Sequence, residues 1–386
     1  MTAREKEPVT GPLLDNDFVA PAYHDRSLGD VLPAVASAMG VDAGLGATSL
    51  VFPEAQRYVV FLVDGLGYEL LRDHPDEAPF LHSLLGSHEP ATVGVPSTTA
   101  TSLTSLGTAL TPGTHGIVGY TSRIPGSDRL LNALLWDAEV EPREWQPHTT
   151  AFARLAAAGV HTTVVNKRDF RDSGLTVAGS RGAEFVGADK VGERLAAVVH
   201  ASTGSPSVTY MYDGDLDWTG HAYGVRSMQW QQELSMIDAA AEHLRESLPS
   251  DVRIAVVADH GMVDSPAGRR LDVDDHPELL EGVTLVGGEA RFRQLYCRGG
   301  AVEDVAATWR EVMGERAEVL TRDEALRLGW FGELSSDVRP RIGDVLVACR
   351  EDYAVLSRSG FPIETKLVGL HGSLTSAEML IPILVA

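Results

Sequence analysis

The sequence predicts an α/β protein, a three-layer α/β/α sandwich with a mostly parallel central sheet and a smaller α+β insertion. Three observations support this fold class. Short apolar runs rich in β-branched residues recur along the chain, as strands buried on both faces require. Helix-like stretches separate these runs, and strands alternating with helices indicate a parallel sheet covered on both sides. From residue 264 onward, shorter strand-like runs surround one helix, which predicts the insertion.

The expected core elements follow one another in chain order. A short helix is expected in the stretch LGDVLPAVASAMG, before the first strand. The four strands expected in the sheet are RYVVFLV at 57–63, VHTTVV at 160–165, SVTYMY at 207–212 and RIAVVA at 253–258. The helices expected among them cover residues 78–86, 148–159, 188–202 and 228–248. The closing segment MLIPILVA is expected to form a terminal strand.

The predicted organisation is a core made of residues 1–263 and 365–386 and an inserted α+β cap at 264–364. The insertion contains the apolar runs TLVGG and DVLVACR and a helix-like stretch, VEDVAATWREVMG. The sequence has no internal repeat and no obvious linker, so the cap is expected to pack on the core.

Composition excludes several classes of protein. With 386 residues, 44% of them hydrophobic, the chain can bury a large core. Its formal net charge of −22 repels polyanions, so a nucleic-acid polymer is not an expected partner. Cys297 and Cys349 form no CxxC pair, which argues against a disulfide framework and against a thiolate zinc site.

No segment has the pattern of a membrane span or a signal peptide. No run reaches the roughly 18 apolar residues that a spanning helix needs. The opening residues, MTAREKEPVTGPLLDN, lack the basic and apolar regions of a secretory leader. We therefore expect a cytoplasmic protein that does not use a membrane as a partner.

Aspartate and histidine residues cluster near the ends of the predicted strands, where ligands gather in open α/β sheets. They are Asp64 after the first strand, Asp213, Asp215 and Asp217 after the third, Asp259 and His260 after the fourth, and His371 before the last. Carboxylate oxygens and neutral imidazole nitrogens are the common zinc ligands apart from thiolates. Each residue alone also fits a turn or a polar loop. Their shared position predicts a metal site.

Spacing refines this prediction. Asp217 and His221 are four residues apart in DLDWTGH, close enough to share one ion, and Gly220 lets the chain bend. A polar loop after the strand, without a metal, is the alternative interpretation. Asp259 and His260 are adjacent, which suits a bridging position between two ions.

The segment VPSTTATSLTSLGTALTPGTHGIVGY carries a dense run of hydroxyl side chains. Helix capping accounts for one or two of them. A hydroxyl at a helix N-terminus that also contacts a metal ion can instead serve as a nucleophile. His115, within PGTHGI, is expected to have a structural role. Tyr212 and Trp218, beside the Asp217 segment, could stack on a substrate base, but packing is the preferred interpretation.

The order of the motifs VDGLG, PSTTATS…PGTHGI, DLDWTGH, ADHGM and GLHGSLT resembles the alkaline-phosphatase superfamily, in particular its nucleotide pyrophosphatase/phosphodiesterase branch. Each motif is weak alone, whereas five in the right order are a strong signal. The resemblance implies an alkaline-phosphatase-like fold. A Ser-x-Ala-x-Arg pattern at Ser265–Arg269 matches the sulfatases of this superfamily, but it lies too late in the chain to supply their nucleophile.

The resemblance also implies roles for individual residues. It implies two divalent metal ions, expected to be zinc, the first bound by Asp64, Asp259 and His260 and the second by Asp217, His221 and His371. It makes Thr99 the nucleophile, activated by the first ion, with Ser97 and Thr98 as alternatives in the hydroxyl run. Ser102 stands where relatives often have an asparagine that holds a phosphoryl oxygen, and its hydroxyl could donate instead.

The activity implied is hydrolysis of a small phosphoester, either a phosphodiester or a nucleotide pyrophosphate, through a phosphothreonine intermediate. A phosphomonoesterase or phosphonate hydrolase is the nearest alternative, because the sequence contains no residue that separates these substrates. An intramolecular phosphate mutase and a metal-binding protein without turnover also stay open. The sequence does not determine the oligomeric state.

Overall fold

The computed structural model describes residues 18–86 and 89–386. Within them, the central sheet has six strands in the order β18-β8-β1-β7-β5-β6. Strands β8, β1, β7, β5 and β6 are parallel, and only the edge strand β18 runs antiparallel, against β8. The predicted α/β fold class with a mostly parallel sheet is therefore confirmed. The sequence-based expectation of no signal peptide concerns residues 1–16, which lie outside the described residues.

The strands of the central sheet are β1 (Arg57–Val63), β5 (His161–Asn166), β6 (Glu184–Gly187), β7 (Ser207–Asp213), β8 (Val252–Ala258) and β18 (Ile383–Val385). All residues of β1 after Arg57 are buried, because the strand lies between two neighbours and under helices on both faces. The register places Val63 of β1 level with Asp213 of β7 and with Ala258 of β8. The residues that follow these three strands therefore meet at one edge of the sheet.

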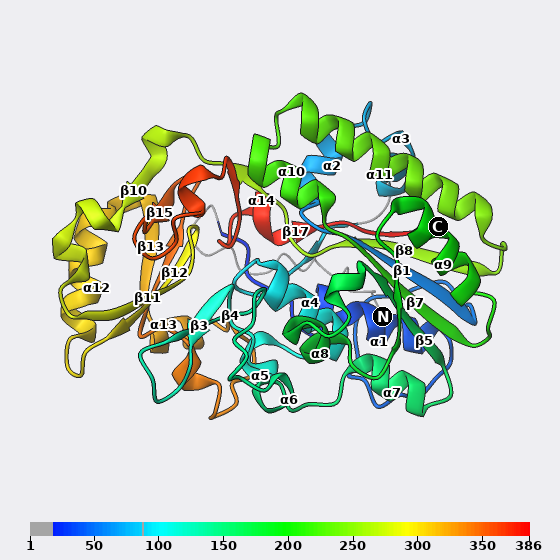
Figure 1. The fold of residues 1–386 in the computed structure, drawn as a ribbon, viewed down its shortest axis with the longest axis horizontal. Coiled ribbons are helices and arrows are strands. Elements are labelled where there is room, and N and C mark those ends of the chain that lie inside the picture. The colour runs from blue at the N-terminus through cyan, green and yellow to red at the C-terminus, as the bar shows by residue number, and fades with distance from the viewer. Residues whose placement is uncertain (1–17, 87–88) are drawn as a thin grey trace, which may run out of the picture.

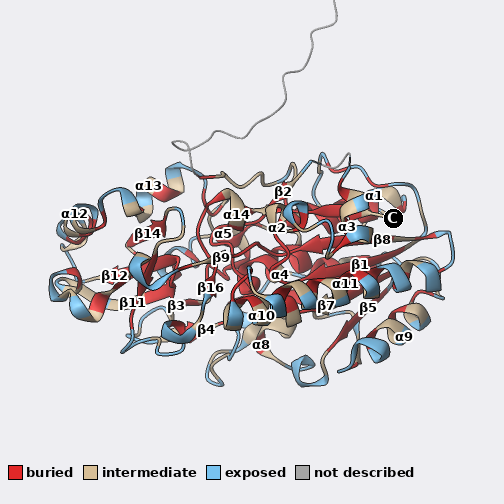
Figure 2. Ribbon diagram, turned by 90° about the horizontal axis from the view of Figure 1, so that it is seen from above, coloured by how far each residue is buried: buried red, intermediate tan, exposed pale blue. Residues whose placement is uncertain are grey.

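Helices cover both faces of this sheet, as Figure 1 shows, with α2, α3, α9 and α11 on one side and α1, α4, α7 and α8 on the other. The helices of the core are α1 (Val31–Ala38), α2 (Tyr68–Asp73), α3 (Pro79–Leu85), α4 (Thr99–Thr108), α5 (Pro112–His115), α6 (Pro142–Trp145), α7 (Ala151–Ala157), α8 (Gly174–Ser180), α9 (Val191–Ala201), α10 (Asp215–Tyr223), α11 (Met228–Ser247) and α14 (Ser376–Met379). In Figure 2 the strands β1, β7 and β8 are buried, whereas α9 and α11 expose one side to solvent.

Three expectations about the core differ from the structure. DLDWTGH is not a loop but the first part of helix α10. The closing segment forms two short strands, β17 (Leu380–Ile381) and β18, because Pro382 between them cannot donate a ladder hydrogen bond. Strand β6 and helix α8 were not predicted, since their segments are short and only partly buried.

The insertion contains a separate four-stranded antiparallel sheet in the order β11-β12-β14-β13. Its strands are β11 (Val283–Glu289), β12 (Phe292–Cys297), β13 (Ala317–Thr321) and β14 (Val345–Cys349), and its helices are α12 (Val302–Met313) and α13 (Arg322–Arg327). One side of α12 packs Trp309 and Met313 into a second apolar core.

Four short two-stranded ladders lie outside these two sheets in the described part of the chain. They are β2–β17 (β2, Ala91–Thr92), β3–β4 (Thr121–Arg123 and Leu130–Asn132), β9–β16 (Val263–Asp264 and Gly369–Leu370) and β10–β15 (Arg270–Asp272 and Ala354–Leu356). The chain leaves the core at β9 and returns at β16, and these strands pair with one another. A buried ion pair between Arg291 and Glu378 links the segment after β11 to helix α14 of the core. The boundaries at 264 and 364 stay a prediction.

Two further findings concern expected absences. Cys297 and Cys349 are both free thiols. Within the described chain, no helix combines the length and the apolar character that crossing a bilayer requires.

Candidate active site

Thr99 is the first residue of helix α4, at the edge of the sheet where β1, β7 and β8 end. Its Oγ1 lies 3.2 Å from Nε2 of His260 and 3.5 Å from Oδ1 of Asp64. The N-cap residue Thr98 makes no side-chain capping hydrogen bond within the described chain. The first N–H groups of α4 are therefore not satisfied by a cap, and the positive end of the helix dipole lies beside the Thr99 hydroxyl.

Asp64, Asp259 and His260 form a buried group around this hydroxyl. His260 Nε2 lies 3.3 Å from Asp64 Oδ1 and 3.5 Å from Asp259 Oδ2. Asp64 follows β1 directly and Asp259 follows β8, so the parallel register brings them together. The structure thus places side by side the three residues that the sequence suggested for one metal ion.

Asp217, His221 and His371 form a second group. His371 Nε2 lies 3.2 Å from His221 Nε2, and Asp217 Oδ2 lies 3.4 Å from the same His221 nitrogen. Asp217 and His221 occupy positions i and i+4 of α10, so the helix itself puts both side chains on one side. Their ligand atoms and that of His371 lie within 4.8 Å of one another, as a shared ion requires.

The two groups are adjacent, and Asp217 belongs to both. A ligand atom of Asp217 also lies within 4.8 Å of those of Asp64 and His260. The His260 and His371 rings stack with their centroids 3.6 Å apart. The sequence suggested the bridging position for Asp259 and His260. In the structure Asp217, in the first turn of α10, is the residue with ligand atoms close to both groups, and the bridging position of Asp259 and His260 stays a prediction.

Backbone carbonyls fix the orientation of all three histidine rings. Nδ1 of His221 lies 2.7 Å from the Gly369 carbonyl oxygen, that of His371 lies 2.9 Å from the Ser97 carbonyl, and that of His260 lies 3.0 Å from the Gly261 carbonyl. A ring that donates through Nδ1–H leaves Nε2 unprotonated and able to bind a metal. Each Nε2 faces the carboxylates.

The electrostatics of the site fit bound cations. Burial, together with the charges of Asp259 and Asp217, raises the pKa of Asp64 well above its usual range. Burial also raises the pKa of Asp217 and of Asp259. Burial lowers the pKa of His260, and burial with the neighbouring histidines lowers that of His371 well below its usual range. Metal binding uses neutral imidazoles, which the lowered histidine pKa values favour. It also uses ionised carboxylates, and bound cations would relieve the burial and mutual repulsion that raise the carboxyl pKa values.

Two buried carboxylate oxygens support the same fit. Oδ1 of Asp217 and Oδ2 of Asp259 have no hydrogen-bond partner among residues 18–86 and 89–386. A buried carboxylate oxygen without a donor is costly unless a cation satisfies it. Bound cations would satisfy both oxygens, so the donor set fits metal binding at this place.

Glycines allow the close approach of these elements. Gly65 has a φ of +74°, and a Cβ there would lie 3.1 Å from the Asp217 Cβ. A Cβ on Gly220 would lie 2.5 Å from Sδ of Met262. Gly220 therefore serves close packing of α10 against the segment after His260, and not the bend that the sequence suggested.

Other residues of the same motifs have structural roles. Asp213 forms a buried ion pair with Arg194, and Asp215 pairs with Lys167 at 2.7 Å, so neither is available as a ligand. His115 is fully buried, its pKa is lowered to about 3 by burial, and its Nε2 lies 3.0 Å from Ser105 Oγ. These contacts agree with the structural role expected for His115.

The structure distinguishes the hydroxyls of the Ser/Thr run. Ser97 donates its hydroxyl to the Ser373 carbonyl at 2.6 Å and so holds the segment after His371. Thr98 and Thr99 both line cavities, but only Thr99 contacts the ligand groups. Ser102 is fully buried and is not among the residues that line the two cavities next to Thr99, and its role as a phosphoryl-oxygen donor stays a prediction.

Thr99 lies at the junction of two cavities. The first, which we call the Trp218 cavity, has a volume of about 240 Å³ and is bounded by Trp218, Glu289 and Glu364 together with His221 and His371. The second, the Phe170 cavity, has a volume of about 310 Å³ and is bounded by Phe152, Phe170, Tyr210 and Tyr212 together with Asp64. Thr99, Leu134 and Asp217 line both. A group attached to either side of a phosphorus atom beside Thr99 would thus have its own cavity.

Sequence reasoning missed or misjudged several residues of these cavities. Tyr212 donates its hydroxyl to Oδ2 of Asp64, so it orients a predicted ligand. Trp218 is 63% exposed at the rim of its cavity, so the expectation that it packs is wrong. Glu289 comes from β11 of the insertion and is only 7% exposed. No signal in the sequence places Glu289 near Thr99, whereas the position of Tyr212 at the end of a strand was such a signal.

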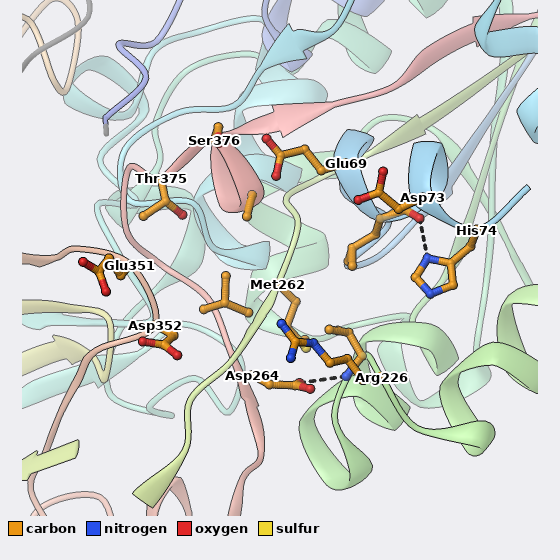
Figure 3. Close-up of a pocket in the computed structure, with 14 residues that line it drawn as sticks. Glu69, Asp73, His74, Arg226, Met262, Asp264, Glu351, Asp352, Thr375 and Ser376 are labelled. Atoms are coloured by element: carbon orange, nitrogen blue, oxygen red, sulfur yellow. Dashed lines mark hydrogen bonds between the residues drawn. The ribbon is translucent and has the colours of Figure 1, made fainter. Parts of the chain in front are cut away.

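A third cavity, of about 450 Å³, lies beyond the segment that follows His260. Figure 3 shows the carboxylates of Glu69, Asp73, Asp264, Glu351 and Asp352 around it. Neither Thr99 nor any of the six predicted ligands lies on the part of its wall that the structure describes, so it is separate from the site.

The mostly parallel sheet, with the Thr99 hydroxyl at a helix N-terminus and the Asp/His groups at the strand ends, gives the chain an alkaline-phosphatase-like α/β fold with a candidate metal site. A family model described as type I phosphodiesterase / nucleotide pyrophosphatase matches residues 58–374. The chain belongs to this family and is a hydrolase acting on phosphoester bonds. Comparison with curated protein sequences found no match.

Solved structures agree with the fold. Murine ectonucleotide pyrophosphatase / phosphodiesterase 5 is 18% identical, with a TM-score of 0.67 over 85% of this chain and 87% of that one. An inactive variant of the murine protein in complex with AMP gives 18% identity and a TM-score of 0.66, over 86% and 87%. The human protein of the same name gives 16% and 0.65, over 85% and 87%.

Proposed function

We propose that this protein cleaves a small phosphodiester of the nucleotide type, with Thr99 as the nucleophile and two zinc ions as cofactors. The position of Thr99 Oγ1 carries the proposal, since it lies beside Asp64 and His260 and opens on two cavities at once. A phosphomonoester has a single organic group and would leave one cavity unfilled. A diester has two such groups, which supports a diester over the monoester that the sequence left open.

The ligand assignment follows the two groups in the site. One ion would be held by Asp64, Asp259 and His260, and the other by Asp217, His221 and His371. The carboxylate and imidazole donors suit zinc. Two bound divalent ions would supply the positive charge that lowers the pKa of the Thr99 hydroxyl and stabilises the departing oxygen.

The chain's own residues account for the remaining steps. Thr99 Oγ1 forms a bond to phosphorus, and the bond from phosphorus to the leaving alcohol breaks. The proton of Thr99 passes to solvent and the leaving alkoxide takes one up. The first turn of α4 presents N–H groups to the phosphoryl oxygens. Water then attacks the phosphothreonine intermediate, which still carries the second organic group, and releases a phosphomonoester.

The organic group that stays on the phosphorus atom after the first step could be a nucleoside. A murine protein of similar fold has been solved in complex with AMP. The Phe170 cavity offers four aromatic side chains, Phe152, Phe170, Tyr210 and Tyr212, against which a nucleobase could stack. A nucleoside phosphoester is therefore the substrate type that we propose.

The test combines metal analysis with a substrate panel. Purified protein should contain about two zinc ions per chain and should hydrolyse bis-p-nitrophenyl phosphate faster than p-nitrophenyl phosphate, and a chelator should abolish turnover. Thr99→Ala should keep the metal but lose turnover and the phosphothreonine detected by mass spectrometry after acid quench. Thr101→Ala removes a buried hydroxyl of the same helix that lines neither cavity, and it should keep activity. A zinc-loaded protein inactive on diesters, monoesters and phosphonates would refute the proposal.

A further inference from the structure

The walls of the two cavities beside Thr99 differ in chemistry. The Trp218 cavity is lined by the carboxyl groups of Glu289 and Glu364 and by the apolar side chains of Leu134, Ile363 and Leu367. Glu364 forms a buried ion pair with Arg293, so its charge is compensated. Of the residues that line either cavity in the described part of the chain, none is Lys or Arg.

Glu289 is the unusual group in this wall. It is 7% exposed, and its Oε2 accepts a hydrogen bond of 3.0 Å from the Tyr120 backbone N–H. Its Oε1 has no hydrogen-bond partner of normal geometry among residues 18–86 and 89–386. The Thr98 side chain is the neighbouring hydroxyl, and its interaction with the carboxyl lowers the pKa of Glu289 without offsetting the effect of burial. The carboxyl packs against the residue after His371, since a Cβ on Gly372 would lie 2.5 Å from Cγ of Glu289. An acceptor buried without a donor is costly, and a donor on a bound substrate would satisfy it.

The position of the cavity relates it to the leaving group. This step rests on the proposed function, in which Asp217, His221 and His371 hold the ion beside the departing oxygen. His221 and His371 line the Trp218 cavity alone, Asp64, on the side of the attacking hydroxyl, lines the Phe170 cavity alone, and Asp217 lines both. With Thr99 between them, the leaving alcohol faces the Trp218 cavity and the retained group faces the Phe170 cavity.

We propose that the Trp218 cavity selects a leaving alcohol that carries a hydrogen-bond donor, with Glu289 as the specificity-determining residue, and disfavours a leaving group that carries phosphate. A hydroxyl or ammonium group on the alcohol would donate to Oε1, while its carbon chain contacts Leu134, Ile363 and Leu367. A phosphate there would meet a carboxyl and no cationic side chain. The protein would then act on diesters in preference to nucleotide pyrophosphates.

The test uses four adenylyl compounds that share one retained group and differ in the leaving group. They are the esters of adenosine 5′-phosphate with glycerol, ethanolamine and propanol, and ADP-ribose, each followed by the release of AMP. The assays run at pH 9, because burial raises the pKa of Glu289 to about 8 and its carboxyl is ionised above that pH. We expect kcat/KM for the glycerol and ethanolamine esters to exceed that for the propyl ester by about tenfold or more, since a site built to bind a donor rejects analogues that lack one. ADP-ribose should be cleaved more slowly than the glycerol and ethanolamine esters, although phosphate is a better leaving group than an alkoxide.

Glu289→Gln changes this selectivity in a defined way. The Tyr120 N–H keeps the amide oxygen as its acceptor, so the amide nitrogen replaces Oε1 and turns an acceptor into a donor. The ethanolamine ester should lose about tenfold in kcat/KM, the glycerol ester should lose less because a hydroxyl can also accept, and the propyl ester should change little. Glu281→Gln, an exposed change in the same insertion, should alter none of them.

A second variant keeps the proposal testable if Glu289→Gln fails to fold. Ile363 is 49% exposed on the cavity wall, so Ile363→Lys adds a cation there without burying it. It should raise kcat/KM for ADP-ribose about tenfold, while Val51→Lys, far from the site and 90% exposed, should not.

The outcomes separate the two proposals. If bis-p-nitrophenyl phosphate and all the adenylyl compounds resist hydrolysis, the proposed function is wrong. If they are hydrolysed but propyl and ethanolamine esters react equally, or Glu289→Gln lowers every rate alike, or ADP-ribose is the best substrate, then the selectivity assigned to Glu289 is wrong and the proposed function stands.

Discussion

Arg291 and Glu378 form a buried ion pair that connects the insertion to the segment carrying His371. Both side chains are fully buried, and Arg291 donates to both carboxylate oxygens, with Nε to Oε1 at 3.0 Å and Nη2 to Oε2 at 2.6 Å. Glu378 also accepts from the Ser373 backbone N–H at 2.9 Å and from the Thr375 hydroxyl at 2.5 Å. The pair thus holds the turn that begins two residues after His371.

Arg291→Met should destabilise the protein strongly. Removing one partner of a buried ion pair leaves an uncompensated charge, which typically costs about 3–5 kcal/mol. Arg291→Met/Glu378→Gln removes both charges but keeps an oxygen for the Ser373 N–H, so it should recover about half of that loss. The exposed pair of Arg269 with Glu351 gives the control, since Arg269→Met should cost less than about 1 kcal/mol.

The assay is urea unfolding of the metal-free variants, followed by zinc titration in competition with a chelator. Because Glu378 fixes the turn after His371, Arg291→Met should also weaken zinc binding at the proposed site that includes His371 by about tenfold or more. A loss of stability no larger than that of Arg269→Met would refute the reasoning, because the ion pair would then behave as an exposed one. Unchanged zinc affinity at a large loss of stability would show that the pair does not position His371.

Three further changes have defined outcomes. Tyr212→Phe removes the hydroxyl that donates to Asp64 and should weaken zinc binding by about tenfold in the same chelator competition, with little change in melting temperature. Gly65→Ala combines a φ of +74° with a Cβ only 3.1 Å from the Asp217 Cβ, so it should cost about 1–3 kcal/mol in urea unfolding and reduce activity. Burial raises the pKa of Glu289 to about 8 from an unfolded value of 4.5, so its contribution to stability is present below pH 4.5 and is lost as the pH rises to about 8. Between pH 4.5 and 8, the unfolding free energy of metal-free wild type should therefore fall by up to about 1.4 kcal/mol per pH unit more than that of Glu289→Gln. If the unfolding free energies of the two proteins change equally with pH, the pKa of Glu289 is not raised.

The central sheet could be predicted from local pattern. The runs at β1, β5, β7 and β8 are apolar and β-branched because each strand is buried on both faces, and this requirement is visible residue by residue. Helix α10 was misjudged, because DLDWTGH is polar and its helix is stabilised by contacts with α11 and the Met262 segment. Propensity alone does not contain that tertiary contribution.

The site was predictable to the extent that it depends on the ends of parallel strands. Asp64 and Asp259 lie close together because β1 pairs in parallel with β8. Each residue directly follows one of the last paired residues, Val63 and Ala258. The assignment of Thr99 within its hydroxyl run depended on a resemblance, and the distances to Asp64 and His260 now distinguish it from Ser97 and Thr98. Its role as nucleophile stays a proposal.

The sequence by itself determined the fold class, the family and a set of residues that could bind metal, because strand burial and strand-end chemistry are encoded locally and in chain order. Only the tertiary structure decided that Asp217 belongs to both ligand groups, that Thr99 lies between two cavities and that Glu289 reaches the site from the insertion. Glu289 and Thr99 are 190 positions apart in the chain, and their proximity depends on how the second sheet docks on the core. That docking depends on side-chain packing across the interface, which leaves no periodic pattern in the sequence.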